Sequence, residues 1–246
     1  MRNFRVFILA LLSSAITLGS STSFANESSP VGITADIKSV TIKVNGKDVV
    51  VQRNQDNDNT VKPAFAKTSR ACPPFCIQPM KLGNGVETIG EVEVVSYIKK
   101  MADGDKSIGL IDSRTPDWLE RGTIPSAVNI PWTHLLPSKG ATTEGIVKIL
   151  TQQFNVKLAK DFDIDDVDEA IVEGKAKTAF DFSDAKTLVM FCNGMWCGQS
   201  PASIKVLVKY GYPVDKIKYF RGGMQTWELL GFTTIKKEEK KKNTKE

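Results

Sequence analysis

The sequence is poor in the residues that build metal centres and cross-linked folds. Its 246 residues include one histidine, His134, and four cysteines. A single histidine excludes a multi-histidine metal site and leaves one imidazole for any Ser-His or Cys-His catalysis. Because a lone histidine is more often packed or exposed than functional, we interpret His134 as structural. Four cysteines are too few for a small disulfide-stapled fold. We expect no cofactor and no metal ion.

The body of the chain also lacks an excess of charge of one sign. The net charge is +5. Residues 1–25 contain two arginines and no acid, and residues 236–246 contain six lysines and three glutamates. The remainder carries equal numbers of basic and acidic residues. The charge therefore does not indicate a nucleic-acid partner, and residues 236–246 are predicted to be a disordered, solvated tail.

The apolar stretch near the N-terminus is too short to span a membrane comfortably. It runs from Val6 to Leu18, follows Arg2 and Arg5, and is followed by Ser23-Phe24-Ala25. This order is typical of a signal peptide, so residues 1–25 are predicted to be removed by cleavage after Ala25. We expect export to a bacterial periplasm and no membrane span after cleavage. An uncleaved anchor is the alternative.

Residues 26–85 are predicted to form an N-terminal extension. Ser39–Val44 and Asp48–Val51 read as strands joined by the turn Asn45-Gly46, which indicates a β-hairpin. A lone hairpin is marginally stable, so it should pack on the main domain or on a partner. Cys72-Pro73-Pro74-Phe75-Cys76 follows as a stiff, non-helical segment.

Residues 86–235 are predicted to form the main domain, in which short apolar strands alternate with helices. Thr88 and Glu91 suggest a capping box at the first helix. The expected strands are Ile108–Ile111, Ala127–Ile130, Thr187–Phe191 and Ile217–Phe220, and the expected helices include those near residues 146–154, 201–210 and 224–230. This alternation favours an α/β fold, with a parallel sheet of about five strands covered by helices on both faces.

The segment after Thr187–Phe191 carries the strongest chemical signal. It places Cys192 at the end of an apolar strand, and a helix is expected to begin at Pro201 with Ser200 as its N-cap. The loop between them comprises Asn193, Gly194, Met195, Trp196, Cys197, Gly198 and Gln199. Backbone N–H groups of such a loop would stabilise a thiolate and lower its pKa. A buried structural cysteine is the alternative. Activity further requires that solute can reach the sulfur.

Several separated motifs resemble those of rhodanese-like (sulfurtransferase) domains in family order. They are Leu110-Ile111-Asp112-Ser113-Arg114, Gly122–Pro131, the strand–Cys192–loop–helix unit, Gly211-Tyr212, and Tyr219–Met224 with Trp227 and Gly231. The resemblance implies that Cys192 takes sulfur from a small sulfur-containing anion such as thiosulfate, holds it as a persulfide, and passes it to a thiophilic acceptor. That acceptor would be a thiol or a sulfur-carrier protein. Asp112, Arg114 and Arg221 would support the loop.

The loop departs from this family in three ways, one of which is that it is a residue or two longer than usual. Gln199 stands where the family commonly has arginine, so the loop contains no cation. The same change disfavours a phosphatase, whose loop needs an arginine to hold the phosphoryl oxygens. The loop also holds a second thiol, Cys197, which could resolve an oxidised Cys192, pair with it structurally, or itself be the nucleophile.

These departures leave three functions in competition. They are sulfur transfer through Cys192, thiol–disulfide exchange by Cys192 and Cys197, and a non-catalytic binding module. For the four cysteines we favour the local disulfides Cys72–Cys76 and Cys192–Cys197 over a zinc site, because their spacings are looser than those of metal knuckles.

The aspartates between residues 161 and 168 invite comparison with a calcium loop. The stretch lacks the glycine of an EF-hand, and Val172 stands at the position of the bidentate glutamate. Phe162, Ile164 and Val167 lie between the acids, which favours an amphipathic surface segment.

Overall fold

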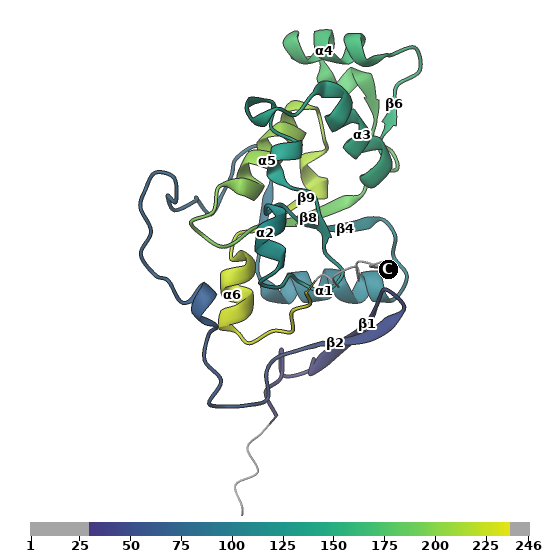
Figure 1. Cartoon of the computed structure of the whole chain (residues 1–246). Coiled ribbons are helices and arrows are strands. Elements are labelled where there is room, and N and C mark those ends of the chain that lie inside the picture. Colours follow the sequence, from purple (N-terminus) through teal and green to yellow (C-terminus); the bar gives the residue numbers. More distant parts are fainter. Residues whose placement is uncertain (1–29, 237–246) are drawn as a thin grey trace, which may run out of the picture.

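A five-stranded parallel sheet forms the centre of the protein in the computed structural model, which describes residues 30–236 (Figure 1). The predicted signal peptide and all but the first residue of the predicted tail lie outside the described residues. The strands follow one another across the sheet in the order β3 (Glu87–Ile89), β9 (Ile217–Phe220), β8 (Thr187–Phe191), β4 (Ile108–Asp112) and β5 (Val128–Asn129). Each neighbouring pair is parallel, as predicted.

The central strand β8 has no polar side chain between its first residue and its end because both faces of the sheet are covered. Leu188 and Met190 belong to one hydrophobic cluster, and Val189 and Phe191 belong to the other. Successive side chains of a strand point to opposite faces, so a continuous apolar run serves both cores.

The helices divide between these two faces. On one face lie α3 (Thr143–Gln153), α4 (Ile164–Val172) and α5 (Gln199–Lys209), and on the other lie α1 (Glu91–Ala102) and α6 (Gly223–Leu229) (Figure 1). The short helix α2 (Pro116–Leu119) follows β4. The predicted α/β class with two covered faces is confirmed.

The segment between β5 and β8 forms an additional layer over α5 (Figure 1). It contains α3, α4 and a small antiparallel pair, β6 (Lys157–Leu158) with β7 (Phe180–Asp181). Single-turn 3₁₀ helices complete the chain: η1 (Pro63–Phe65), η2 (Trp132–His134), η3 (Pro137–Lys139), η4 (Ala176–Ala179) and η5 (Val214–Lys216).

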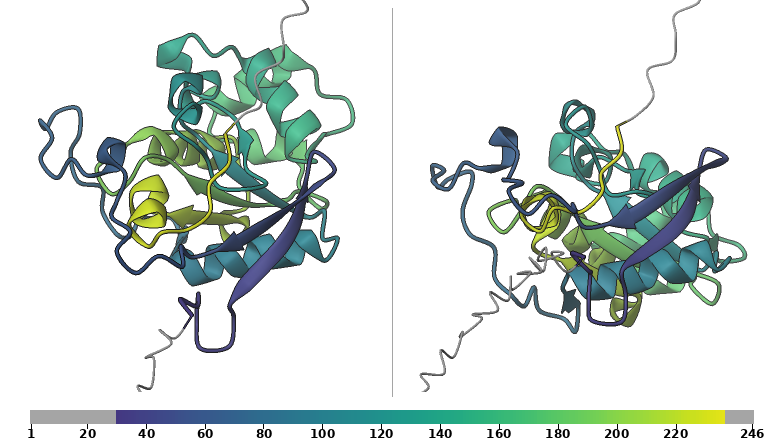
Figure 2. Two further views of the ribbon diagram at one scale, coloured as in Figure 1. Left: turned by 60° about the horizontal axis from the view of Figure 1, so that its bottom comes forward. Right: turned by 90° about the horizontal axis from the view of Figure 1, so that it is seen from below.

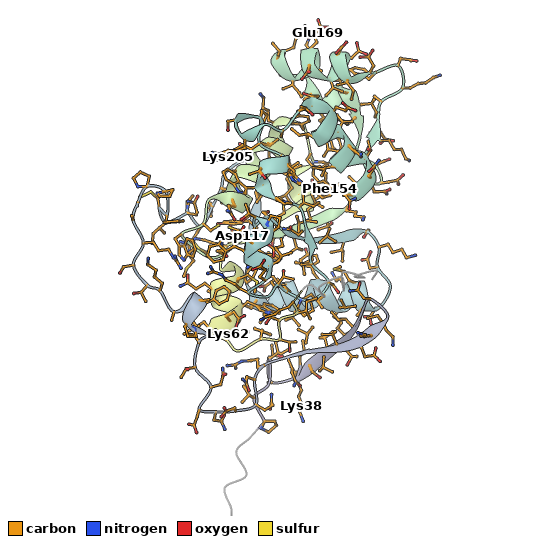
Figure 3. All side chains as sticks on the ribbon, in the orientation of Figure 1. Lys38, Lys62, Asp117, Phe154, Glu169 and Lys205 are labelled. Carbon is orange, nitrogen blue, oxygen red and sulfur yellow. A yellow bond between two sulfur atoms is a disulfide. The ribbon has the colours of Figure 1, made fainter. Side chains whose placement is uncertain are left out.

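The N-terminal hairpin packs on the main domain. Strands β1 (Ser39–Val44) and β2 (Lys47–Gln52) pair antiparallel around Asn45-Gly46, both of which have positive φ, as the sequence predicts. Figure 2 shows the hairpin lying along α1, and its buried side chains join the α1 and α6 hydrophobic cluster. Farther along the extension, Lys62 Nζ lies 2.9 Å from Glu228 Oε1 on α6 (Figure 3). The extension and the main domain therefore share one core.

The predicted capping box at α1 is wrong. Thr88 lies in β3, and the helix begins after Gly90, whose N–H donates to the carboxylate of Glu93 at 2.9 Å. The sheet needs the residues up to Ile89 for pairing with β9, and this moves the helix start to a later residue.

No helix in residues 30–236 is both long enough and apolar enough to cross a bilayer.

Candidate active site

Cys192 lies at the carboxyl end of β8, where the loop turns back towards α5. Ser113, which follows the neighbouring strand β4, donates its N–H to Phe191 O at 2.9 Å, so the two strand ends are held side by side. The loop runs from Asn193 to Gly198, and α5 starts at Gln199. Carboxyl ends of adjacent parallel strands are where sites form in open α/β sheets.

The predicted start of α5 is wrong by two residues. Gly198 is the N-cap, and the N–H of Ala202 donates to its carbonyl at 3.0 Å. Ser200 therefore lies inside the first turn. Its hydroxyl does not cap the helix but donates to the sulfur of Cys192 at 3.2 Å. The residue that the sequence predicts as the N-cap is therefore a hydrogen-bond donor to the thiol.

Hydrogen bonds around Cys192 favour its charged form. Burial raises the pKa of the thiol, but hydrogen bonds to the sulfur outweigh burial and lower the pKa of Cys192 to about 7. The donors are the Cys197 thiol, the Ser200 hydroxyl, and the N–H groups of Ser200 and Gly194. When protonated, the thiol instead donates to Cys197 O at 3.3 Å. Thiolate rather than thiol is the nucleophilic form.

Cys197 is the proton-bearing partner of this pair. Burial raises the pKa of Cys197, and the adjacent Cys192 sulfur raises it further. Its sulfur also lies 3.7 Å from Gln199 Oε1, so Gln199 contacts the second thiol.

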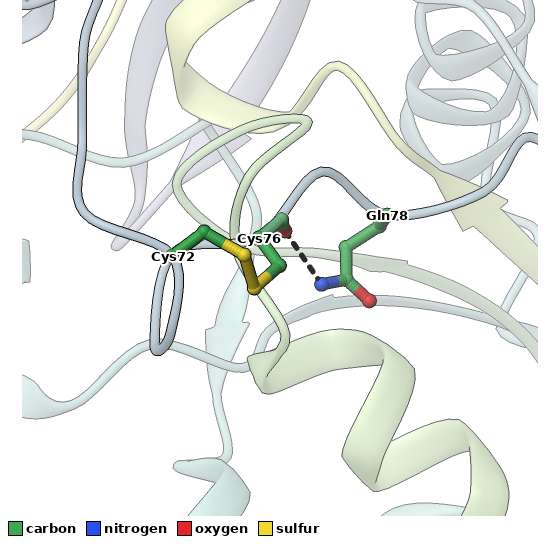
Figure 4. Close-up of a disulfide and its surroundings, with 3 residues drawn as sticks. All are labelled: Cys72, Cys76 and Gln78. Carbon is green, nitrogen blue, oxygen red and sulfur yellow. Dashed lines mark hydrogen bonds between the residues drawn. A yellow bond between two sulfur atoms is a disulfide. The ribbon is translucent and has the colours of Figure 1, made fainter.

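The four cysteines form one disulfide rather than two. Cys72 and Cys76 are bonded, as predicted, with their Cα atoms 4.6 Å apart (Figure 4). The predicted Cys192–Cys197 disulfide is absent, and both residues are free thiols. The two thiols are instead in hydrogen-bond contact with each other. No group of three or more metal-ligating side chains occurs in the described part of the chain, so the zinc and calcium interpretations gain no support there.

A segment of the extension covers the loop. We call residues 70–78 the strap. Gln78 donates its N–H to Met195 O at 2.7 Å and accepts from Arg221 Nε at 2.9 Å through its carbonyl. The Phe75 ring meets the Trp196 ring edge-on, with centroids 5.5 Å apart. Figure 4 shows the disulfide and Gln78 of the strap at this place. Nothing in the local sequence around residues 70–78 indicates this contact.

The sulfur is not open to solvent. Cys192 is 2% exposed and Cys197 is 4% exposed. The expectation that solute reaches Cys192 is therefore not met in this conformation. The amides expected around the sulfur are present.

Asp112 and Arg114 build a buried support beneath the loop. Their side chains form an ion pair with Nη2 2.6 Å from Oδ2, and Arg114 is fully buried. Thr123 Oγ1 also donates to Asp112 at 2.7 Å, and Arg114 donates to Gly122 O at 2.8 Å. The charges of Asp112 and Arg114 neutralise each other in the interior, so Arg114 is not available to a substrate.

The start of α6 closes the other side of the loop. Met224 donates its N–H to Cys192 O and Gln225 donates its N–H to Asn193 O, both at 2.9 Å. A Cβ at Gly223, whose φ is +55°, would lie 2.3 Å from Cys192 O. Only glycine allows this approach, which explains the second glycine of Gly222-Gly223 in the Tyr219–Met224 motif.

Comparison of the sequence with protein-family models identifies the family. The family model for the rhodanese-like domain matches residues 94–230. The chain belongs to the rhodanese-like family. No curated protein matches the chain.

Solved structures with a similar fold include three with distant sequences. A human single-domain sulfurtransferase is 20% identical, with a TM-score of 0.32, over 58% of this chain and 95% of that one. The rhodanese-like domain of an Anabaena protein is 13% identical, with a TM-score of 0.34, over 67% and 88%. A Rhodopseudomonas palustris protein of unknown function, described as a possible tyrosine phosphatase, is 17% identical, with a TM-score of 0.37, over 63% and 88%. None of them bears on the activity of this chain.

Two other sequence candidates lie elsewhere in this rhodanese-like protein. His134, in η2, lines a surface cavity with Thr142 and Lys148 that includes no loop residue. Asp163 caps α4 by accepting from the N–H groups of Asp165 and Asp166, so the acidic run begins a helix. The structure shows no contact of His134 or of Asp163 with Cys192 among the described residues.

Proposed function

We propose that this rhodanese-like protein is a sulfurtransferase in which Cys192 carries the transferred sulfur as a persulfide. The supporting observation is a thiol at the carboxyl end of β8 whose pKa is lowered to about 7 by hydrogen bonds from Ser200, Gly194 and Cys197. A thiolate is available there at neutral pH, and covalent catalysis splits a difficult transfer into two easier steps.

The reaction conserves atoms and electrons. The Cys192 thiolate attacks the outer sulfur of a donor such as thiosulfate, and a new S–S bond forms. The bond between the two donor sulfurs breaks, and sulfite leaves with the electron pair. The persulfide sulfur carries the negative charge until an acceptor thiolate or another thiophile removes that sulfur and regenerates the Cys192 thiolate.

Access is a requirement of this proposal. Because Cys192 is 2% exposed, the strap or the loop has to shift before a donor can touch the sulfur. The strap contacts the loop through Gln78, Phe75 and Arg70. We further propose that residues 1–25 direct the protein to the periplasm, where the Cys72–Cys76 disulfide is stable.

Mass spectrometry of the Cys192 peptide tests the sulfurtransferase proposal. After exposure to thiosulfate, we expect one added sulfur atom on Cys192 of the native chain. Cys192→Ser should lose it and reduce sulfur transfer to cyanide by about a thousand-fold or more. Cys197→Ser is the matched control and should keep the persulfide. Sulfur transfer that survives Cys192→Ser would contradict the proposal. Transfer at an equal background level in both chains would favour a non-catalytic module, and catalysed transfer in the variant would favour Cys197 as nucleophile.

Thiol–disulfide exchange is the second candidate, because the structure brings the two free thiols Cys192 and Cys197 into hydrogen-bond contact. It predicts a Cys192–Cys197 disulfide that forms and breaks reversibly in glutathione buffers, measured by alkylation and mass spectrometry. A pair that stays reduced across these buffers while Cys192 acquires sulfur would leave the sulfurtransferase as the function.

A further inference from the structure

A positively charged side chain of the extension lies over the loop between Cys192 and α5. Gln199 leaves the loop between Cys192 and α5 without a cation. The Arg70 guanidinium of the strap lies over the Trp196 ring of that loop, 3.7 Å from its centroid, and 5.9 Å from the centroid of Phe75. Arginine stacks on aromatic faces in this way while its N–H groups remain available in the plane.

Arg70 carries its charge without a neutralising partner in residues 30–236. Its Nε is buried and has no hydrogen-bond partner, and the structure gives it no ion pair with a described carboxylate. Because no described carboxylate neutralises it, the Arg70 guanidinium keeps its charge for an anionic partner, which its other N–H groups can bind. Arg114, in contrast, donates hydrogen bonds to both the Asp112 carboxylate and the Gly122 carbonyl.

A second arginine, Arg121, adds positive charge near Arg70. Burial lowers the pKa of Arg70, nearby Arg121 lowers it further, and Cys197 raises it. Arg121 lies over the Trp118 ring, 4.2 Å from its centroid, and also lacks an ion pair with any described carboxylate. The positive charge of Arg121 adds to the attraction that Arg70 exerts on an anion.

We propose that Arg70 forms a binding site for the oxyanion end of the sulfur donor, beside Trp196. The inference deepens the proposed function by naming the residue that selects an anionic donor. A planar guanidinium matches two oxygens of a sulfonate group through parallel N–H bonds, which makes arginine the suitable residue.

The strap is built to hold Arg70 at this place. The Cys72–Cys76 disulfide closes the chain two residues after Arg70, and Gln78 attaches the end of the strap to Met195 and Arg221. Cys76 O also accepts from the side-chain amide of Gln78 at 2.9 Å (Figure 4). The extension thus supplies a component of the site that the rhodanese-like domain lacks.

Calorimetric titration with thiosulfate tests the site in the full mature chain. The parent is Cys192→Ser, which prevents turnover, and chloride at equal ionic strength is the reference. We expect Arg70→Gln to weaken thiosulfate binding about ten-fold or more, because it removes charge-assisted hydrogen bonds. Arg70→Lys should retain part of the affinity. Lys81→Gln, an exposed charge loss just beyond the strap, should leave it unchanged.

The outcomes separate this inference from the proposed function. Equal affinity in the parent and in Arg70→Gln, or an equal loss in Lys81→Gln, would overturn the anion site. In the chain with native Cys192, Arg70→Gln should raise the KM for thiosulfate with little change in kcat, and an effect on kcat alone would also count against the site. If thiosulfate binding depends on Arg70 but native Cys192 acquires no sulfur, the anion site stands and the sulfurtransferase proposal fails.

Discussion

At the scale of single residues, the charge of Cys192 depends on a few donors that are close in space. Ser200 contributes both its hydroxyl and its backbone N–H, and Cys197 contributes its thiol. Each donor favours the thiolate over the thiol and so lowers the pKa. The neighbouring acid and base, Asp112 and Arg114, neutralise each other in the interior and hold the strand end in place.

Ser200→Ala should raise the pKa of Cys192 because it removes a hydrogen bond to the thiolate. In the native chain, alkylation of Cys192 by iodoacetamide should increase with pH through a midpoint near 7, and in the variant the midpoint should lie higher. Ser203→Ala is the control, because the buried Ser203 hydroxyl lies on the same helix and has no hydrogen-bond partner among the described residues. Equal midpoints in Ser200→Ala and the native chain would show that the hydroxyl does not act on the thiolate.

The same shift predicts how folding stability depends on pH. The pKa of Cys192 is lower in the folded protein than its ordinary value of 9.0. The stabilisation from the thiolate is therefore fully present above that ordinary value and is lost as the pH falls through about 7.

At the scale of elements, the loop after β8 is clamped between two helices. α5 supplies Ser200 from its first turn, and α6 supplies the N–H groups of Met224 and Gln225. The Trp196 indole N–H also donates to Gln225 Oε1 at 2.7 Å, so the loop is tied to α6 through a side chain as well. The position of the sulfur depends on how closely α6 approaches the end of β8.

Gly223→Ala should disturb this clamp. The new Cβ would lie 2.3 Å from Cys192 O and 2.9 Å from Gly194 N, so the loop or α6 has to move. Gly104→Ala is the matched control, since Gly104 also has positive φ but a Cβ added there would have no neighbouring atom within 4 Å. The control should cost about 1–2 kcal/mol of unfolding free energy and keep persulfide formation, whereas Gly223→Ala should cost more and slow it. Urea unfolding and mass spectrometry measure the two effects.

At the scale of the whole molecule, the extension belongs to the same folding unit as the rhodanese-like domain. Its hairpin shares a hydrophobic cluster with α1 and α6, and Asn54 donates its N–H to Gly231 O at 2.7 Å. The extension passes from this core to the strap. One segment therefore both completes a core and covers the active-site loop.

Val51→Ala should destabilise the entire protein by about 2 kcal/mol, because Val51 is fully buried in the shared cluster and the substitution leaves a cavity. Its neighbour Val50 is 43% exposed, so Val50→Ala should change stability by less than about 0.5 kcal/mol. Urea unfolding followed by tryptophan fluorescence measures both. If Val51→Ala left the unfolding midpoint of the main domain unchanged, the hairpin would be an independent appendage.

The sequence by itself determined the elements whose signals are local. The apolar run Thr187–Phe191 required a strand buried on both faces, and Asn45-Gly46 required a tight hairpin turn. Backbone sterics and side-chain periodicity act over a few residues, so such elements are readable without the fold. The place of Cys192 at the end of β8 followed from the same local pattern, and the separated motifs identified the family.

Only the tertiary structure decided what surrounds the sulfur. Gln78 meets Met195, and Arg70 meets Trp196, across more than a hundred residues of chain. Serine is a common N-cap residue, yet the Ser200 hydroxyl donates to the Cys192 sulfur because β8 and α5 place the two side chains together. Contacts at such separations depend on the path of the whole chain, and no local preference of the strap encodes its partner.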